Sequence, residues 1–338
     1  LIPNFNCSFQ IEKMTKRAVV IVLLFLLHSL SITESRNSPI IGILSEPIIN
    51  EKNNETEFMI AASYVKWLEM SGARSIAIPY DANLEQINMI FASIDGLLFP
   101  GGAGKILPDA ARYLWKLAKG TIGFPIWGTC LGFEYLIMLA SEDDFILEGG
   151  FDAENISLPL TLYNRSKNNI PSELYRNMNM TTLQSHNLSM NNHMFGITPS
   201  KFESNTNLMS IFRITSTSQD RNGRWFVSTI EPQNSSRFPY FGVQYHPEKN
   251  TFEYATYPGT DIPFEDIPHE LEALELSRDL GLFFVQQVKQ SQMKRQRMLL
   301  TNTFPPIYTY ERRIGLKFQE YYIIPKAATY FRTIIMKE

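Results

Sequence analysis

Short apolar runs alternate with amphipathic segments along the first half of the chain. The apolar runs occupy residues 38–44, 75–79, 94–99 and 125–128. The amphipathic segments repeat apolar residues every three or four positions, at 57–70, 83–92, 109–119 and 131–140. The first pattern is typical of buried strands and the second of helices. Their alternation predicts βαβ units, and therefore a mostly parallel sheet flanked by helices.

The second half predicts additions to this sheet. Two β-rich runs, 210–217 and 225–231, flank a turn with Asn-Gly chemistry, which predicts a hairpin that extends the sheet. A further strand over 240–246 ends at a histidine. The remaining expected elements are loops and short strands over 148–210 with a helix near 171–176, a long helix within 267–290, and a terminal β segment over 304–325. We therefore expect a three-layer α/β fold with an added β-hairpin and a C-terminal extension.

The first 35 residues are typical of a targeting segment. Met14 is the first methionine, and Lys16 and Arg17 precede a ten-residue apolar run (AVVIVLLFLL), which polar residues follow. Because this run is too short to span a bilayer comfortably, it predicts a secretory signal peptide over 14–35, with a signal anchor as the alternative. Residues 1–13 are then expected to be leader sequence or a non-native extension. We expect no stable membrane span after signal removal.

Composition and cysteine use narrow the class of protein. The 338 residues are 44% hydrophobic, which suffices for a packed core, and the net charge of −3 gives no reason to expect a nucleic-acid partner. Cys7 precedes the expected signal peptide, so the mature chain would hold Cys130 alone and no internal disulfide. A lone thiol in a secretory protein needs a reason, and catalysis is one. Sequons, which fit the same route, occur at Asn54, Asn155, Asn164, Asn179, Asn187 and Asn234.

Cys130 lies in a Gly-x-Cys-x-Gly frame between an expected strand and an expected helix. A nucleophile on such a tight turn needs small neighbours, which Gly128 and Gly132 provide. The helix N-terminus would lower the pKa of the thiol and offer backbone N–H groups to an oxyanion. The alternative is a buried structural cysteine, but the frame and a later His-Pro-Glu favour a nucleophile.

A glycine-rich loop follows the preceding strand, at Pro100-Gly101-Gly102-Ala103-Gly104. Because ligands bind at the carboxyl ends of parallel strands, this loop is expected beside Cys130. We expect the backbone N–H of Gly102, paired with that of Leu131, to form an oxyanion hole. A simple flexible turn is the alternative, and a phosphate-binding loop is disfavoured because no Gly-Lys-Ser/Thr follows.

His246 ends a strand, and Pro247 prevents that strand from continuing. Glu248 can reach back to the imidazole, which completes a set of nucleophile, base and orienter. A strand-end histidine beside a solvated glutamate is the alternative reading. His186 and His193 are unremarkable from their local sequence.

Three motifs together resemble the class I glutamine amidotransferase-like family: PGG at 100–102, WGTCLG at 127–132 and GVQYHPE at 242–248. Within it, PIIGIL at 39–44, CLGFE at 130–134, VQYHPEK at 243–249 and FPPIYT at 304–309 are similar to the gamma-glutamyl hydrolase family. The resemblance runs from about 39 to 325, so 36–325 is expected to be the catalytic domain and 326–338 a tail.

The resemblance implies roles for individual residues. Cys130 would be the nucleophile, His246 the general base and acid, and Glu248 its orienter. His186 would assist binding or catalysis, which leads us to expect that the adjacent Asn187 stays unglycosylated. Glu134 and Gly101 are expected to contribute to the pocket. Tyr245 departs from the tryptophan often found in this motif, a change between aromatic residues that should leave the chemistry unaltered.

The resemblance also implies an activity. The expected reaction is hydrolysis of γ-glutamyl isopeptide bonds in folate or antifolate poly-γ-glutamates, without metal or cofactor, by a homodimer in lysosomes or outside the cell. A glutaminase domain that feeds a synthetase is one alternative, although no partner domain follows in this chain. A catalytically inactive secreted binding protein of the same fold is the other, and the retained Cys130, His246 and Glu248 disfavour it.

Overall fold

A computed structural model describes residues 38–50, 53–104, 106–163, 171–292 and 304–335 of the chain. The expected signal peptide, Cys7 and the sequon at Asn164 lie outside these residues. None of the helices described is long and apolar enough to cross a membrane.

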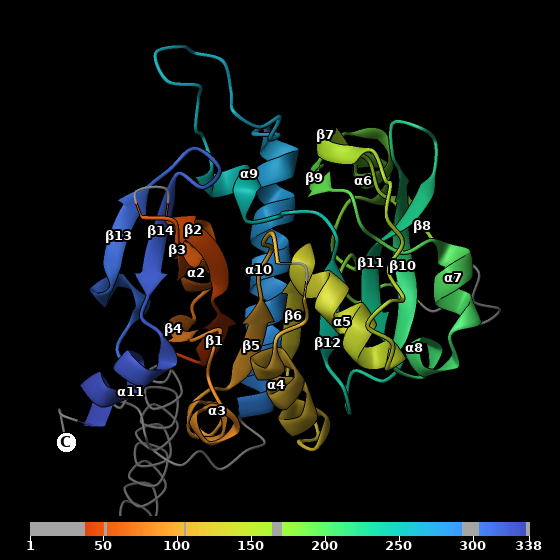
Figure 1. Ribbon diagram of the computed structural model, residues 1–338. Coiled ribbons are helices and arrows are strands. Elements are labelled where there is room, and N and C mark those ends of the chain that lie inside the picture. The colour runs from red at the N-terminus through yellow and green to blue at the C-terminus, as the bar shows by residue number, and fades with distance from the viewer. Residues whose placement is uncertain (1–37, 51–52, 105, 164–170, 293–303, 336–338) are drawn as a thin grey trace, which may run out of the picture. The chain divides into compact units, whose positions relative to one another are not determined.

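A central eight-stranded sheet organises the residues from Pro39 onward (Figure 1). Its strand order is β4-β1-β5-β6-β12-β11-β10-β8. The bounds along this order are Arg74–Ile78, Ile40–Leu44, Gly96–Phe99, Ile126–Thr129, Tyr240–Val243, Trp225–Pro232, Phe212–Gln219 and Thr161–Leu162. The five strands from β4 to β12 are parallel, and β11, β10 and β8 add antiparallel pairs. The predicted mostly parallel sheet and its added hairpin are therefore confirmed.

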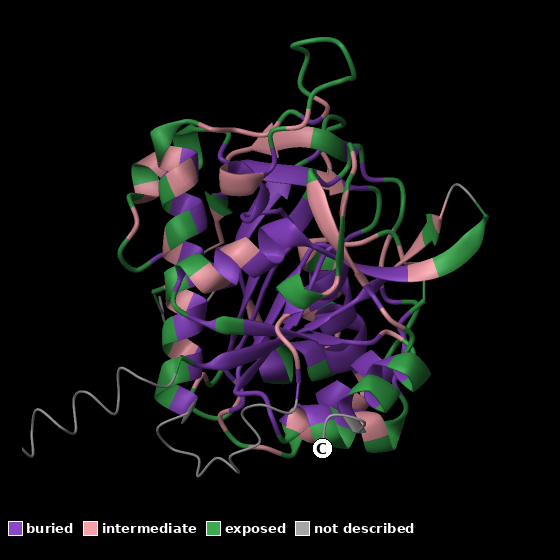
Figure 2. Ribbon diagram, turned by 90° about the vertical axis from the view of Figure 1, so that its left-hand side faces the viewer, coloured by how far each residue is buried: buried purple, intermediate pink, exposed green. Residues whose placement is uncertain are grey.

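Helices cover both faces of the sheet. On one face α3 packs on α4 and α5 packs on α8, and on the other α2 and α10 pack together with α9. Their bounds are Ala62–Met70 (α2), Leu84–Phe91 (α3), Asp109–Lys119 (α4), Leu131–Ser141 (α5), Thr206–Ile211 (α8), Lys249–Phe252 (α9) and Leu271–Gln292 (α10). Because the strands lie between two helical layers, they read as continuous apolar runs rather than alternating ones. Figure 2 shows these strands as buried along most of their length.

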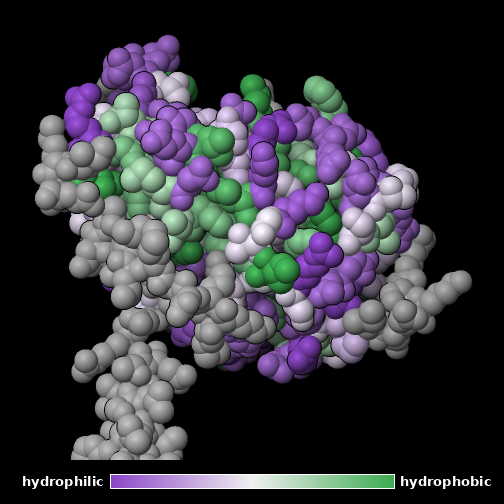
Figure 3. Space-filling view, turned by 90° about the horizontal axis from the view of Figure 1, so that it is seen from below, coloured by the Kyte–Doolittle hydropathy of each residue, from purple (hydrophilic) through white to green (hydrophobic). Residues whose placement is uncertain are grey.

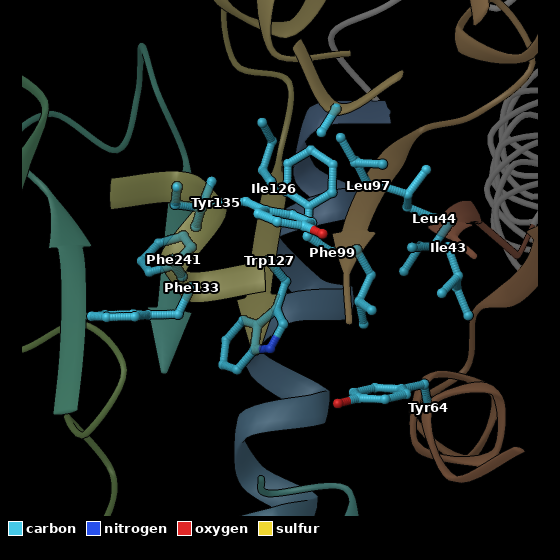
Figure 4. Close-up of a cluster of buried hydrophobic side chains, with 14 of the residues drawn as sticks. Ile43, Leu44, Tyr64, Leu97, Phe99, Ile126, Trp127, Phe133, Tyr135 and Phe241 are labelled. Carbon is cyan, nitrogen blue, oxygen red and sulfur yellow. The ribbon is translucent and has the colours of Figure 1, made fainter. Parts of the chain in front are cut away.

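Aromatic side chains join the layers of the core. Trp127 on β6 contacts Trp67 on α2 at 5.3 Å between ring centroids and Phe284 on α10 at 5.6 Å. Phe241 on β12 pairs in register with Trp127, whereas Phe99 on β5 lies on the other face of the sheet against Tyr135 of α5, at 6.1 Å between ring centroids (Figure 4). All of these side chains are buried, and this packing holds the carboxyl end of β6 in place.

A second, antiparallel sheet has the order β13-β14-β3-β2. The strands, in that order, span Glu311–Ile314, Glu320–Ile324, Glu55–Ala61 and Glu46–Asn50. The predicted terminal β segment is thus present, preceded by the short helix η1 (Ile307–Thr309). The helix expected over 57–70 is wrong at its start, because 55–61 pair with β2 and β14 and α2 begins only at Ala62. Strand pairing on both sides overrides the helical spacing there.

The segment 148–210 holds further short elements: β7 (Ala153–Leu158), α6 (Met180–Ser185), β9 (Ser189–His193) and α7 (Pro199–Ser204). The helix expected near 171–176 is wrong, since a turn occupies 173–178 and the helix begins after Asn179. The oxygen of the Asn179 side chain accepts the N–H groups of Thr181 and Thr182, which fixes that start. Residues 210 and 211, expected to open a strand, instead end α8.

Residues beyond 325, expected to be a tail, include the helix α11 (Ala327–Ile335). Tyr330, Phe331 and Ile334 are buried, and the Tyr330 hydroxyl donates a hydrogen bond to the Ala77 carbonyl on β4. The packed structure thus continues past the expected boundary, through the last residues described.

Candidate active site

Cys130 sits on the turn between β6 and α5, as predicted. Its φ of 50° and ψ of −106° are rare for a residue with a side chain, and such strain is typical of nucleophile-bearing turns. The thiol is buried, with 5% exposure, and forms no disulfide.

The two flanking glycines are required by contact. A Cβ on Gly132 would lie 1.9 Å from the carbonyl oxygen of Phe99, and a Cβ on Gly128 would lie 2.5 Å from that of Gly132. Real Cβ atoms do not approach oxygen this closely, so no larger residue fits without moving the backbone. The predicted need for small neighbours is confirmed.

His246 and Glu248 follow β12, the strand next to β6. Glu248 Oε1 lies 2.8 Å from His246 Nδ1, and both side chains are buried. Because an ionised carboxylate only accepts, Nδ1 carries the proton and Nε2 is left to accept one. The backbone N–H of His246 donates to the Met190 carbonyl, so β9 helps to fix the base.

The thiol and the imidazole meet over the glycine loop. A Cβ placed on Gly101 would lie 2.6 Å from His246 Cε1 and 3.3 Å from Cys130 Cβ. Adjacent strands supply both residues, since the Cys130 N–H donates to the Val243 carbonyl at 2.9 Å. The structure therefore brings Cys130, His246, Glu248 and Gly101 to one place at the carboxyl edge of the sheet.

The glycine loop also adjoins the N-terminus of α5. A Cβ on Gly102 would lie 3.1 Å from Leu131 Cδ2, so the two residues expected to form the oxyanion hole are neighbours. The backbone N–H of Gly101 is occupied, because it donates to the Tyr64 hydroxyl at 2.7 Å. The oxyanion role of Gly102 and Leu131 stays a prediction, and Gly101 is placed instead as a tight contact for His246.

The electrostatics of the thiol differ from the expectation. Burial raises the pKa of Cys130, and the charge of Glu134 raises it further, while the charge of Lys249 and the Leu131 N–H lower it. The helix N-terminus thus acts in the predicted direction, but burial outweighs it, and a net lowered pKa is not found. A thiol that is neutral at rest needs a base to remove its proton during the reaction, which is a task for His246.

Glu134, one helical turn after Cys130, is buried and accepts a hydrogen bond from Gln244 Nε2 at 3.1 Å. Burial raises its pKa to about 8. The charge of Glu134 raises the pKa of the Cys130 thiol, and its role as a pocket residue stays a prediction.

Three buried polar residues at the site were not anticipated. Tyr64 on α2 contacts the glycine loop, Glu46 at the start of β2 lies 3.0 Å from a Cβ on Gly102, and the Lys249 ammonium pairs with the Glu265 carboxylate at 2.5 Å. Glu46 Oε1 has no hydrogen-bond partner among the residues that the structure describes, and burial raises the pKa of this carboxyl well above its usual value. Lys249 was visible only as the residue after the His-Pro-Glu motif, and Tyr64 and Glu46 carried no local signal.

His186 is placed at the exposed C-terminal end of α6, where its Nδ1 lies 3.0 Å from Ser185 Oγ. Its only described polar contact is thus local, and its assisting role stays a prediction. His193, by contrast, is buried against Phe226, and burial lowers its pKa to about 4. No group of three or more potential metal ligands occurs among the residues described.

The sequons in the described part of the chain lie at the surface. Those with exposed asparagines are Asn54, Asn155, Asn179, Asn187 and Asn234. Three of these amides also support local structure: Asn155 Oδ1 accepts the Asp266 N–H, Asn179 Oδ1 accepts the Thr181 N–H, and Asn234 Oδ1 accepts the Arg237 N–H. Each leaves its Nδ2, the atom that would carry a glycan, outside that bond.

The family described as "Glutamine amidotransferase class-I" matches residues 58–259. The chain is 32% identical over 299 residues to "Gamma-glutamyl hydrolase B" of Dictyostelium discoideum, covering 83% of this chain and 81% of that protein. It is 34% identical to "Gamma-glutamyl hydrolase" of Bos taurus (75% and 78% covered) and 31% identical to that of Homo sapiens (82% and 87% covered). The chain therefore belongs to the gamma-glutamyl hydrolases of the class I glutamine amidotransferase family.

Proposed function

We propose that this protein hydrolyses γ-glutamyl isopeptide bonds with Cys130 as nucleophile. The observation that carries this proposal is the convergence of Cys130 and the His246–Glu248 pair over Gly101, in a chain similar to proteins named gamma-glutamyl hydrolase.

The first half of the reaction forms a thioester. His246 Nε2 takes the thiol proton while Cys130 Sγ attacks the γ-carbonyl carbon of the substrate. Gly102 and Leu131 donate backbone N–H groups to the resulting oxyanion. The C–N bond then breaks, and His246 gives its proton to the departing α-amine.

The second half releases the acyl group. His246 takes a proton from water, whose oxygen attacks the thioester carbonyl, and the C–S bond breaks to restore the thiol. Glu248 holds the imidazole in one orientation throughout and stabilises its charged form. The proposed substrate class is folate or antifolate poly-γ-glutamate, and neither a metal nor a cofactor takes part.

We place this activity in the secretory pathway, in lysosomes or outside the cell, with N-glycans at Asn54, Asn155, Asn164, Asn179 or Asn234. Homodimerisation is proposed from the family alone. Large apolar side chains such as Phe145 and Ile122 are exposed, and the face seen in Figure 3 carries apolar residues among polar ones.

One assay tests the reaction. Pure protein and its Cys130→Ala variant are incubated with folate pentaglutamate and, separately, with glutamine. Shortening of the polyglutamate by intact protein alone supports the proposal. Release of ammonia from glutamine in its place points to a glutaminase, and turnover of neither substrate by folded protein points to an inactive binding protein.

A further inference from the structure

Tyr64 lies between the glycine loop and the general base His246. It projects from α2 toward the sheet (Figure 4), and its side chain is 1% exposed. Its hydroxyl accepts the Gly101 N–H at 2.7 Å and lies 3.4 Å from His246 Nδ1. A Cβ on Gly101 would meet this hydroxyl at 2.8 Å and His246 Cε1 at 2.6 Å, so all three groups are in contact.

The hydroxyl proton of Tyr64 does not go to His246. Nδ1 of His246 cannot take it, because that nitrogen carries a proton of its own toward Glu248. That Nδ1–H group instead faces the Glu248 carboxylate at 2.8 Å and the Tyr64 oxygen at 3.4 Å, and burial together with the Glu248 charge raises the pKa of Tyr64 well above its usual value. The phenol is therefore neutral, and its oxygen accepts from the Gly101 N–H and lies beside Nδ1 of His246.

We propose that Tyr64 is a positioning residue for the reaction at Cys130. Its hydroxyl connects the backbone of the glycine loop to the imidazole of His246, which Glu248 also holds. One side chain from a third element, α2, thereby holds the spacing between the glycine loop and His246. The inference rests on the proposed function for the choice of substrate, but not for the behaviour of the thiol.

The Tyr64→Phe variant tests this idea, because it removes only the hydroxyl. With folate pentaglutamate we expect kcat to fall about 10- to 100-fold, since small misplacements of reacting groups cost this much, while KM changes less than about 2-fold. The pH dependence of Cys130 alkylation by iodoacetamide should also shift, because the imidazole that takes the thiol proton loses part of its support.

Tyr330→Phe is the matched control. The Tyr330 hydroxyl on α11 is likewise buried and hydrogen-bonded, but its partner is the Ala77 carbonyl on β4. It should keep the kcat and the alkylation profile of the native protein. If Tyr64→Phe keeps kcat within about 2-fold, or if it yields no native fraction while Tyr330→Phe does, the positioning role is wrong.

A double variant tests the route of action. If Tyr64 acts by holding the same imidazole that Glu248 orients, adding Tyr64→Phe to Glu248→Gln should lower kcat by less than about 3-fold further, whereas independent effects would multiply. Multiplying effects would overturn the proposal. If the native protein does not turn over pentaglutamate at all, the proposed function fails, and the alkylation profiles still decide the role of Tyr64.

Discussion

Gly132 on α5 touches the Phe99 carbonyl at the end of β5, where a Cβ would lie 1.9 Å from the oxygen. The nucleophile turn and the strand before the glycine loop therefore pack backbone to backbone. This contact sets how near Cys130 can lie to Gly101 and Gly102. Gly132 is therefore needed because it lets α5 and the end of β5 pack closely, not because it makes the turn flexible.

Replacing Gly132 by alanine should destabilise the protein by about 3 kcal/mol, because the obstructing group is backbone and cannot rotate away. Gly120→Ala is the control, since its φ is −79° and its Cβ would meet no atom closer than 3.5 Å. Urea unfolding monitored by tryptophan fluorescence measures both. Equal stability of the two variants would show that the turn relaxes freely.

Prediction from the sequence worked where the signal is local. The Cys130 frame and the His-Pro-Glu run each lie within a few residues of one strand end, and the edge of a parallel sheet brings strand ends together. The strand β3 could not be found in this way, because 55–61 match helical spacing and its partner β14 comes from the far end of the chain.

The same reasoning explains which site residues were missed. Tyr64 lies within an apolar helix, where an aromatic residue is normally core, and its role appears only through contact with Gly101 and His246. Glu46 follows β1 as one carboxylate among many in the sequence. The direction of the Cys130 pKa was also beyond reach, because burial depends on the whole fold.

Changing Glu248 to glutamine should lower kcat by at least about 100-fold with little change in KM. The amide is neutral, so it cannot stabilise the imidazolium, and its NH₂ can turn toward Nδ1 and select the wrong tautomer. Glu320→Gln, which removes a surface partner of Lys66, is the control. Near-native kcat for Glu248→Gln would exclude the orienting role.

Stability should fall as the pH rises from about 5 to 8. The pKa of Glu46 is raised well above its usual value in the folded state, and that of Glu134 is raised to about 8. Between the unfolded and folded pKa values, the unfolded chain loses protons that the folded protein keeps, so ionisation favours unfolding.

The Glu46→Gln variant checks this dependence. Its amide cannot ionise, so the free energy of unfolding should decrease less steeply with pH than in the native protein. The slope, measured by urea unfolding at several pH values, is the readout. An unchanged slope would mean that Glu46 ionises equally easily when folded.

Glycopeptide mapping of active protein from a secretory host should find Asn187 unmodified. Asn187 is exposed, but it adjoins His186, and a glycan there would crowd the residue expected to assist at the site. Occupancy is expected among Asn54, Asn155, Asn164, Asn179 and Asn234. A glycan on Asn187 in fully active protein would contradict both this prediction and the assisting role of His186.

Removing residues 326–338 should destabilise the protein strongly, whereas removing 336–338 alone should not. The longer deletion takes away α11, whose Tyr330, Phe331 and Ile334 side chains are buried. Burying three such side chains contributes on the order of 5 kcal/mol, and the Tyr330 bond to Ala77 is lost as well. Chains ending at 325 and at 335 are compared by urea unfolding and by their yield of monodisperse protein. Equal stability of the two chains would mean that the catalytic fold ends at 325. A large loss of stability in the shorter chain would show that α11 belongs to this fold, because its Tyr330 binds Ala77 on β4, the edge strand of the central sheet.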